Sequence, residues 1–202
     1  MKVVIVGGVA GGATAAARIR RLNEQAEIVV FELSGYISYA NCGLPYYIGG
    51  VIEDPEDLTL QTPESFFSRF RIHMKAHHEV TAIHPDSKTV SVKNLETGEI
   101  FEESYDKLLL SPGAKPVWPN LPGMNSDKLF TLRTVEDTFR IKEFVDQQRP
   151  KSAVMVGGGF IGLEVAENLR ELGMEVTIVQ RPKQLMNPFD ADMASFIHSE
   201  VR

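Results

Sequence analysis

The chain of 202 residues has a single cysteine, a single tryptophan and no apolar run long enough to span a bilayer. One cysteine, Cys42, excludes an internal disulfide framework and suits a reducing compartment, so we expect a cytoplasmic protein. Positive charge is also in short supply. The formal net charge of −6 argues against nucleic acid as a partner, and the absence of a spanning segment argues against a membrane. A hydrophobic fraction of 43% permits an ordinary globular core.

An internal duplication organises the chain. Residues 3–8 read Val-Val-Ile-Val-Gly-Gly, and residues 153–158 read Ala-Val-Met-Val-Gly-Gly. In each copy the apolar strand leads through a glycine turn into an Ala/Leu-rich helix and then a second apolar strand, at residues 27–31 and 175–179. The pattern predicts an α/β protein with two Rossmann-like βαβ dinucleotide-binding units, the second incomplete.

Different material lies between the two copies. The predicted elements are a helix at 64–69, strands at 78–84 and 89–92, a strand at 108–110 and a helix at 135–148. The first two strands indicate a small β-meander inserted in the first unit, and the third returns to the first sheet. A proline-rich stretch from Pro116 indicates a linker, and Pro150 ends the helix that follows it.

The second glycine loop fits the dinucleotide pattern G-x-G-x-x-G, with its glycines at Gly157, Gly159 and Gly162. These glycines allow a tight turn, close approach of a pyrophosphate and close packing of helix on strand. Gln180 and Arg181 follow the second strand, where an acid would repel a 2′-phosphate. The loop therefore predicts a nicotinamide site that favours NADPH or accepts both NADPH and NADH. The alternative is that Arg181 is only a solvated charge.

The first glycine loop departs from the pattern because Val9 occupies the middle glycine position. Gly8 and Gly11 could supply the missing room, and Glu32 stands 20 residues after Gly12, where an acid binds a ribose hydroxyl. The loop residues expected to contact the cofactor are Gly7, Gly8, Val9, Ala10, Gly11 and Gly12.

Two dinucleotide sites indicate one bound and one exchangeable redox carrier, so we assign FAD to the first and NADH or NADPH to the second. The expected domains are an FAD-binding domain at 1–115, a linker and connecting helix at 116–150, and a partial NAD(P)-binding domain at 151–202.

Cys42 is the candidate redox residue. We expect Asn41 to cap a helix that runs from Cys42 through Ile48 and ends at Gly49-Gly50. A thiol at a helix N-terminus is partly ionised, which is the state that attacks a disulfide. Without a second cysteine, Cys42 must cycle between thiolate and a mixed disulfide, or between thiolate and sulfenic acid. The alternative is a small, buried and inert residue.

The first helix offers a candidate anion site. Thr14, Arg18 and Arg21 are spaced to share one face, and the opposite face is apolar. A hydroxyl and two guanidinium groups in a row suit phosphates, as in coenzyme A (CoA). The alternative is an ordinary solvated helix face. The histidines lack metal-ligand spacing, and no metal is expected.

These motifs and their order resemble the single-cysteine pyridine nucleotide-disulfide oxidoreductases. The resemblance rests on the first glycine loop, Glu32, Ser38-x-x-x-Cys42, Ser111-Pro112-Gly113-Ala114 and the second glycine loop. Within that group, Asn41-Cys42-Gly43-Leu44-Pro45-Tyr46 looks like the CoA-disulfide reductases. The resemblance implies that NAD(P)H reduces FAD, and that Cys42 then reduces a CoA disulfide, persulfide or polysulfide. Ser38 and Asn41 match positions near the substrate and thiolate, and Ser111, Pro112 and Gly113 match positions at FAD.

The resemblance also bears on the substrate site and the length of the chain. Thr14, Arg18 and Arg21 match CoA-binding positions, and Arg69 and Arg71 flank Phe70, which replaces a usually basic residue. Family members are about twice as long and form homodimers, so we expect an N-terminal fragment that is inactive or nearly so. Two alternatives remain open. One is an NAD(P)H oxidase or peroxidase that cycles a cysteine sulfenic acid, and the other is a non-catalytic nucleotide-binding module.

Overall fold

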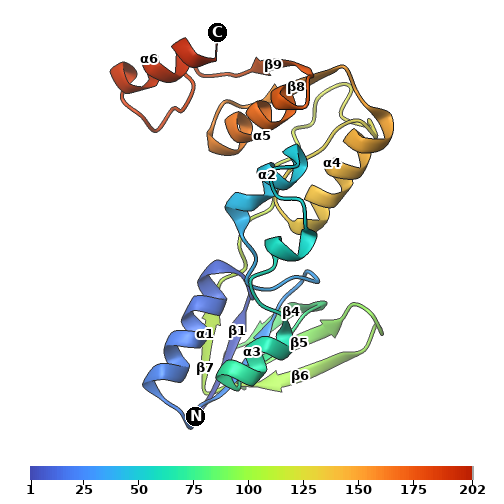
Figure 1. Ribbon diagram of the computed structural model, residues 1–202. Coiled ribbons are helices and arrows are strands. Elements are labelled where there is room, and N and C mark those ends of the chain that lie inside the picture. Colours follow the sequence, from blue (N-terminus) through green and yellow to red (C-terminus); the bar gives the residue numbers. More distant parts are fainter. Residues whose placement is uncertain (202) are drawn as a thin grey trace. The chain divides into compact units, whose positions relative to one another are not determined.

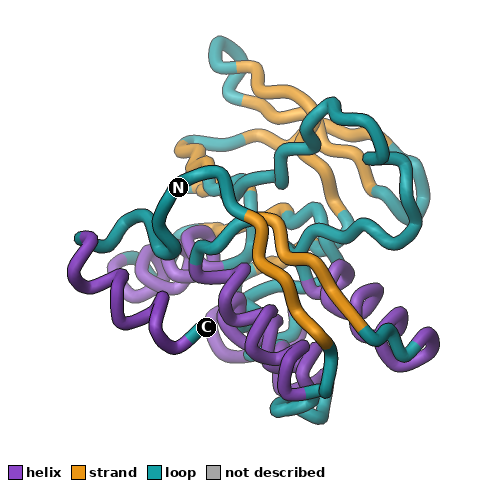
Figure 2. The backbone as a smooth tube through the Cα atoms, turned by 90° about the horizontal axis from the view of Figure 1, so that it is seen from above, coloured by secondary structure: helices purple, strands orange, loops and turns teal. Residues whose placement is uncertain are grey.

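The computed structural model describes residues 1–201. Its helices and strands, in chain order, are β1 (Lys2–Val6), α1 (Ala10–Leu22), β2 (Glu27–Phe31), α2 (Leu44–Gly49), α3 (Pro63–Phe70), β3 (His73–Lys75), β4 (His78–His84), β5 (Thr89–Asn94), β6 (Ile100–Ser104), β7 (Lys107–Leu110), α4 (Val135–Gln148), β8 (Ser152–Val156), α5 (Phe160–Glu171), β9 (Glu175–Val179) and α6 (Ala191–Glu200). Two short 3-10 helices, η1 (Asn41–Gly43) and η2 (Pro55–Leu58), flank α2. Apart from the start of α2, the elements predicted from the sequence are confirmed, and β2, β9 and α4 have the predicted bounds. Figure 2 shows the strands gathered into separate small sheets with helices and loops beside them.

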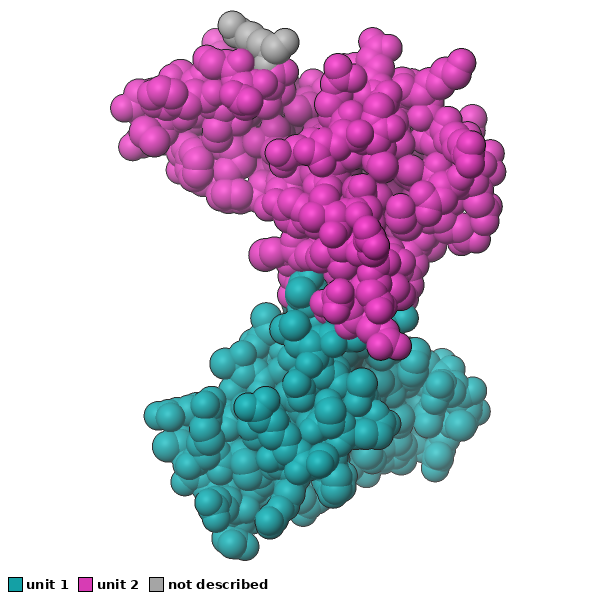
Figure 3. Space-filling model, in the orientation of Figure 1, with its two compact units in different colours: residues 1–40, 59–115 teal, residues 41–58, 116–202 magenta. Residues whose placement is uncertain are grey.

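The chain divides into two compact units, coloured separately in Figure 3. Unit 1 holds residues 1–40 and 59–115, and unit 2 holds residues 41–58 and 116–202. The chain therefore leaves unit 1 just before Cys42 and returns to it at Thr59. No helix of residues 1–201 combines the length and apolar character needed to cross a membrane.

Unit 1 is built on a four-stranded parallel sheet in the order β3-β2-β1-β7. Strand β7 returns from the inserted segment to pair with β1, as predicted, with Val4 opposite Leu108. Strand β3 was not predicted from the sequence. It is three residues long and extends the sheet beside β2. The β-branched runs of β1 and β2 suit a sheet that is covered on both faces.

Each face of that sheet has its own cover. Helices α1 and α3 cover one face, where α1 lies along the strands in Figure 1. The buried residues on that face include Val3, Ile5, Ala13, Ala16, Ile28, Val30 and Phe66. The antiparallel meander β4-β5-β6 covers the other face. The buried residues there are Val4, Val29, Phe31, Val90 and Val92. Alternate residues of β1 thus serve two cores, which holds the strand rigidly beneath the first glycine loop.

Unit 2 packs helices α2, α4 and α5 with the parallel pair β8-β9 (Figure 1). Its core contains Ile48, Ile141, Val165, Leu169 and Met174. The ring of Tyr47 also meets the ring of Phe139 edge-on, with centroids 5.5 Å apart. Helix α2, which follows Cys42 directly, is therefore held between the helix of the second glycine loop and helix α4.

Candidate dinucleotide loops and redox site

The first glycine loop turns sharply from β1 into α1. Gly7 has a φ of +97°, and its N–H donates to the Phe31 carbonyl at 2.8 Å. A Cβ at Gly7 would overlap the Ser111 carbonyl, and one at Gly12 would overlap the carbonyl of Gly7. A Cβ at Gly11 would likewise overlap Oγ of Ser111. Gly7, Gly11 and Gly12 therefore keep the loop compact although Val9 occupies the middle glycine position.

Glu32 fastens this loop from the end of β2. Its side chain is buried, and Oε2 accepts a hydrogen bond from the Gly8 N–H at 2.6 Å. Oε1 accepts from the N–H and Oγ of Ser34 at 3.0 and 2.9 Å. A carboxylate offers about four acceptor positions, so Glu32 can still accept a ribose hydroxyl.

The helices behind the two glycine loops begin without side-chain caps. Val9 precedes α1 and Gly159 precedes α5, and neither side chain caps its helix. Helices α3 and α4 begin with capping boxes, built on Thr62 and Thr134, and α2 and α6 also lack a side-chain cap. Open N–H groups and the positive end of the helix dipole suit a pyrophosphate, so both loops fit a bound dinucleotide.

The second glycine loop repeats the geometry of the first. Gly157 has a φ of +107° and donates to the Val179 carbonyl at 2.8 Å. Gln180 stands where Glu32 stands in the first unit: its Oε1 accepts from the Gly158 N–H at 2.8 Å, and its Nε2 donates to the Gln184 carbonyl. The Gln180 amide is thus engaged with the protein, whereas the next residue, Arg181, is exposed.

The duplication extends beyond the second strand of each unit, which the sequence did not reveal. Ser38 has a φ of +46°, and its N–H donates to the Gly8 carbonyl at 3.0 Å. Met186 has a φ of +49° and donates in the same way to Gly158 at 2.8 Å. Ser38 lies six residues after Glu32, and Met186 lies six residues after Gln180. Both units therefore close the loop with a left-handed residue, and in unit 1 that residue is the predicted site residue Ser38.

Cys42 is exposed and lies in the 3-10 helix η1, before α2 rather than at its first position. The prediction that Asn41 caps a helix beginning at Cys42 is therefore wrong. Helix α2 begins at Leu44 after Gly43 without a side-chain cap, residues 41–43 form η1, and Oδ1 of Asn41 accepts a hydrogen bond from Arg133. The other end is confirmed, since Gly50 ends α2 with a φ of +82°.

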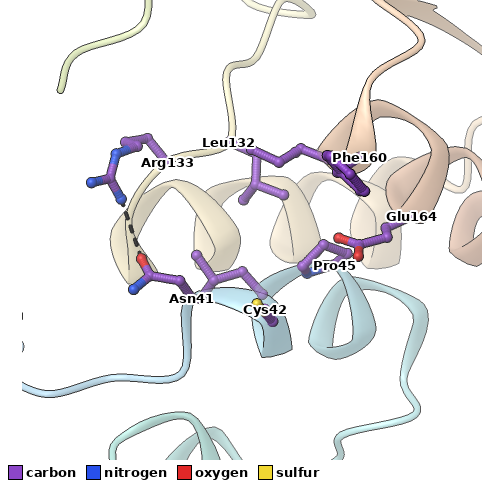
Figure 4. Close-up of a pocket in the computed structure, with 9 residues that line it drawn as sticks. Asn41, Cys42, Pro45, Leu132, Arg133, Phe160 and Glu164 are labelled. Atoms are coloured by element: carbon purple, nitrogen blue, oxygen red, sulfur yellow. Dashed lines mark hydrogen bonds between the residues drawn. The ribbon is translucent and has the colours of Figure 1, made fainter. Parts of the chain in front are cut away.

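Cys42 lines a pocket of about 420 Å³ within unit 2 (Figure 4). The lining residues are Asn41, Cys42, Leu44, Pro45, Leu132, Arg133, Phe160, Ile161 and Glu164. Arg133 lies on the side of Asn41, and Phe160 and Glu164 lie on the other side, from the first turns of α5. Sequence reasoning missed Arg133, Phe160 and Glu164 because they lie far from Cys42 along the chain and no local motif marks them.

The three residues predicted to form an anion site on α1 belong to unit 1. Thr14, Arg18 and Arg21 are exposed, whereas Ala13 and Ala16 are buried against the sheet.

Arg20, which the sequence analysis did not single out, turns away from that face. It donates to the carbonyls of Phe70 and Arg71 at 2.7 and 2.8 Å. Helix α1 is thereby tied to the end of α3, where Arg69 and Arg71 are exposed.

The remaining predicted residues lie at the end of β7. The N–H of Ser111 donates to the Val6 carbonyl at 2.8 Å, which places the residue beside the first loop. Pro112 and Gly113 follow it and are exposed. Every predicted FAD contact therefore belongs to unit 1. Of the predicted catalytic and substrate residues, Asn41 and Cys42 belong to unit 2 and the others to unit 1.

Two βαβ units whose glycine loops lead into uncapped helix N-termini define a dinucleotide-binding protein of the Rossmann type. All residues of the chain, 1–202, match the family described as pyridine nucleotide-disulphide oxidoreductase, and the chain belongs to that family. The match confirms the Rossmann-type fold and the expected cofactors, FAD and NADH or NADPH.

Similar proteins support the same family. The chain is 46% identical over 200 residues to the coenzyme A disulfide reductase of Staphylococcus haemolyticus, covering 99% of this chain and 45% of the relative. The crystal structure of reduced Bacillus anthracis CoADR-RHD is 51% identical with a TM-score of 0.96, covering 99% of this chain and 36% of that one. An NAD-dependent persulfide reductase from A. fulgidus is 34% identical with a TM-score of 0.94, covering 100% and 38%. The chain thus spans about half the length of the curated relatives it matches.

Proposed function

We propose that the chain supplies the FAD-binding and sulfur-reactive part of an enzyme that uses NAD(P)H to reduce CoA disulfide, or a related CoA persulfide or polysulfide, through Cys42. The observation that carries this proposal is the exposed Cys42 in a pocket with residues of α5, the helix of the second glycine loop. Relatives named coenzyme A disulfide reductase support the substrate class.

The proposed reaction needs one protein sulfur. The Cys42 thiolate attacks one sulfur of CoA disulfide, forms a Cys42–S–S–CoA bond and releases one CoA thiolate, which takes a proton from solvent. FAD, when bound, supplies a carrier that takes two electrons from NAD(P)H and delivers them to sulfur. Those electrons and one proton split the mixed disulfide, which restores the Cys42 thiolate and releases the second CoA thiol. One NAD(P)H and one proton are consumed for two CoA thiols.

The cofactors divide between the two loops. We assign FAD to residues 1–115, with its ribose on Glu32, its pyrophosphate on residues 7–12 and further contacts from residues 111–113. We assign the nicotinamide cofactor to residues 151–202, with its pyrophosphate on Gly157, Gly159 and Gly162. Residues 116–150 connect the two. Because Gln180 adds no negative charge and Arg181 is an exposed cation, we propose that NADPH is favoured there.

The substrate contacts follow from exposed charge. Thr14, Arg18 and Arg21 offer a hydroxyl and two guanidinium groups to the phosphates of CoA, and Arg69 and Arg71 add charge at the end of α3. Ser38 and Asn41 serve the reacting end of the substrate. A lone free cysteine suits a reducing compartment, so we place the protein in the cytoplasm, and we propose that the full-length enzyme is a homodimer.

The first half of the reaction tests this proposal without any need for turnover. The purified 202-residue chain, loaded with FAD and reduced, is mixed with CoA disulfide and its mass is measured. We expect one CoA per chain, and none in Cys42→Ser. If Cys42 reacts with a small neutral disulfide but takes up no CoA, CoA disulfide is not the substrate. Steady turnover of NAD(P)H by these 202 residues alone is expected to be slight.

A second candidate is an NAD(P)H oxidase or peroxidase. An exposed cysteine without a second cysteine could attack hydrogen peroxide, form a sulfenic acid and release water. A chain that gains one oxygen from peroxide faster than it gains CoA from CoA disulfide would favour this candidate. A Cys42 inert to both reagents would favour the non-catalytic nucleotide-binding module.

A further inference from the structure

We propose that Arg133 is a positioning residue that fixes the side-chain amide of Asn41, so that its N–H groups serve the CoA-disulfide reaction at Cys42. This inference rests on the proposed function and adds a residue to it. Neither the glycine loops nor the cysteine motif contains Arg133, which lies directly before α4.

The geometry begins with one hydrogen bond. Nη1 of Arg133 donates to Oδ1 of Asn41 at 3.2 Å, across 92 positions of sequence, and Figure 4 shows this bond at the end of the Cys42 pocket where Asn41 and Arg133 lie. A guanidinium can only donate, so the Asn41 amide must turn its oxygen toward Arg133. The Nδ2 group of Asn41 is then the end that remains for another acceptor, and among residues 1–201 no protein group accepts from it.

Both partners of this hydrogen bond are held in place before any ligand arrives. The backbone N–H groups of Arg133 and Thr134 donate to Oδ2 of Asp137 at 3.0 and 3.1 Å. The N–H of Asp137 donates in return to Oγ1 of Thr134 at 3.2 Å, which completes a capping box at the start of α4. The Arg133 backbone is therefore fixed by the first turn of α4.

The other partner is fixed through α2. Tyr47 packs on Phe139 of α4, and Ile48 lies in a buried cluster with Ile141 of α4. Asn41 and Cys42 form η1, directly before α2. Because α2 and α4 pack together within unit 2, the Arg133–Asn41 bond joins two fixed elements at the edge of the Cys42 pocket. A preorganised donor is worth more than one that must be ordered during the reaction.

The chemistry needs a donor at this place. When Cys42 attacks a CoA disulfide, negative charge develops on the departing sulfur, and an amide N–H can stabilise it. Without Arg133 the Asn41 amide is free to rotate and to present its oxygen, which would repel that charge. Arg133 therefore acts through Asn41 and needs no contact with the substrate.

Six variants of the 202-residue chain separate this role from general stability. Each is loaded with FAD and reduced, and Cys42 is allowed to react with CoA disulfide and, separately, with bis(2-hydroxyethyl) disulfide. The measured quantity is the second-order rate constant with CoA disulfide divided by that with bis(2-hydroxyethyl) disulfide. Partial unfolding alone would not change this ratio, because both reagents need the same thiol. We expect Arg133→Met to lower the ratio about tenfold, and Arg133→Lys, which can still donate to Oδ1, to lower it less.

The remaining variants test the direction of the amide, supply a control and test whether the two residues act together. Asn41→Asp keeps an acceptor for Arg133 but loses the N–H donors, so we expect it to lower the ratio at least as far as Arg133→Met. Arg140→Met, on the exposed side of the same helix, is the matched control and is expected to leave the ratio unchanged. In an Asn41→Leu background, Arg133→Met should have little further effect, because the two residues act as one unit.

The outcomes distinguish this inference from the proposed function. If the unaltered chain takes up CoA and Arg133→Met matches its ratio, only the role of Arg133 is overturned. If the effects of Arg133→Met and Asn41→Leu simply add, Arg133 acts independently of Asn41 and the inference is also wrong. If the unaltered chain takes up no CoA while reacting with the small disulfide, the proposed function fails and the inference fails with it.

Discussion

Glu32 and Gln180 occupy the same position in the two βαβ units, and each accepts a hydrogen bond from the second residue of its glycine loop. The Gly8 N–H donates to Glu32 at 2.6 Å, and the Gly158 N–H donates to Gln180 at 2.8 Å. The two side chains therefore have one structural task in common, to hold the glycine loop against the second strand. They differ in charge, which is the property that decides between a ribose hydroxyl and a 2′-phosphate.

The charge difference predicts the effect of Gln180→Glu. A carboxylate at this position can still accept from the Gly158 N–H, but it repels a 2′-phosphate. It also faces the Gln184 carbonyl, to which Nε2 of Gln180 donates in the unaltered chain. We expect the ratio of NADPH to NADH affinity to fall about tenfold or more, with a stability loss of about 1–3 kcal/mol. Titration of both cofactors measures the ratio. Gln147→Glu, exposed on α4, adds the same charge elsewhere and should leave the ratio unchanged. An unaltered ratio in Gln180→Glu would refute this account of specificity.

Glu32→Gln makes the converse test in unit 1. The new Oε1 can accept from Gly8, but Nε2 cannot accept from the N–H of Ser34. We expect weaker FAD binding and a loss of about 1–3 kcal/mol in unfolding free energy, because buried polar groups lose their partners. Flavin fluorescence titration and thermal unfolding measure the two effects. Glu24→Gln, exposed near the end of α1, is the matched control. FAD affinity equal to that of the unaltered chain would show that Glu32 does not bind the cofactor.

Much of the fold was predictable because its signals are local. The β-branched runs and glycine turns of the duplication fixed β1, β2, β8 and β9 to within a residue. Strand β3 escaped prediction because three residues are too few to show alternation, and only Met74 among them is buried. The start of α2 was predicted wrongly for a different reason. Residues 41–43 form η1 before α2, and the Asn41 side chain meets Arg133, a partner 92 positions away that no local pattern indicates.

The candidate site likewise contains residues that local motifs predict and residues that only the packing of helices brings together. Local motifs predict Cys42, Glu32 and the glycine loops, because the residue types and spacing of these motifs are typical of particular chemistry. Phe160 and Glu164 meet Cys42 in one pocket only because α2 packs on α5 through Ile48, Val165 and Leu169. The sequence indicates that Ile48, Val165 and Leu169 are apolar enough to be buried. It does not indicate that α2 and α5 pack against each other.

Lys2 predicts how stability depends on alkaline pH. Hydrogen bonds from its ammonium to Glu103 at 2.6 Å and, next in weight, to Glu27 at 2.9 Å raise the pKa of Lys2 above its ordinary value. A raised folded-state pKa gives stability that is fully present below about pH 10.4, the unfolded value, and is lost as pH rises through the folded value. We expect Lys2→Met to lower unfolding free energy by at most about 1 kcal/mol at neutral pH.

The pH series makes that prediction specific. The difference between the unaltered chain and Lys2→Met should begin to shrink above about pH 10.4, where Lys2 loses its proton in the unfolded chain, and should be lost as the pH rises through the raised folded-state pKa. Denaturant unfolding at several pH values measures the difference. Lys107→Met, exposed in β7, is the control and should show no such pH dependence. A difference that stays constant through this range would mean that packing of the Lys2 side chain, and not its charge, supplies the stability.

Gly49 predicts how closely α2 must approach α5. A Cβ at Gly49 would overlap Oδ1 of Asn168, a buried atom with no hydrogen-bond partner among residues 1–201. We expect Gly49→Ala to cost about 1–3 kcal/mol of unfolding free energy because it forces two packed helices apart. Asn168→Ala removes the overlapping oxygen, so the double variant should recover part of the loss in thermal unfolding. Gly50→Ala meets open space, and any cost there comes from its φ of +82° and should not be rescued by Asn168→Ala. Equal rescue at both glycines would show that the Gly49–Asn168 contact does not set the spacing of α2 and α5.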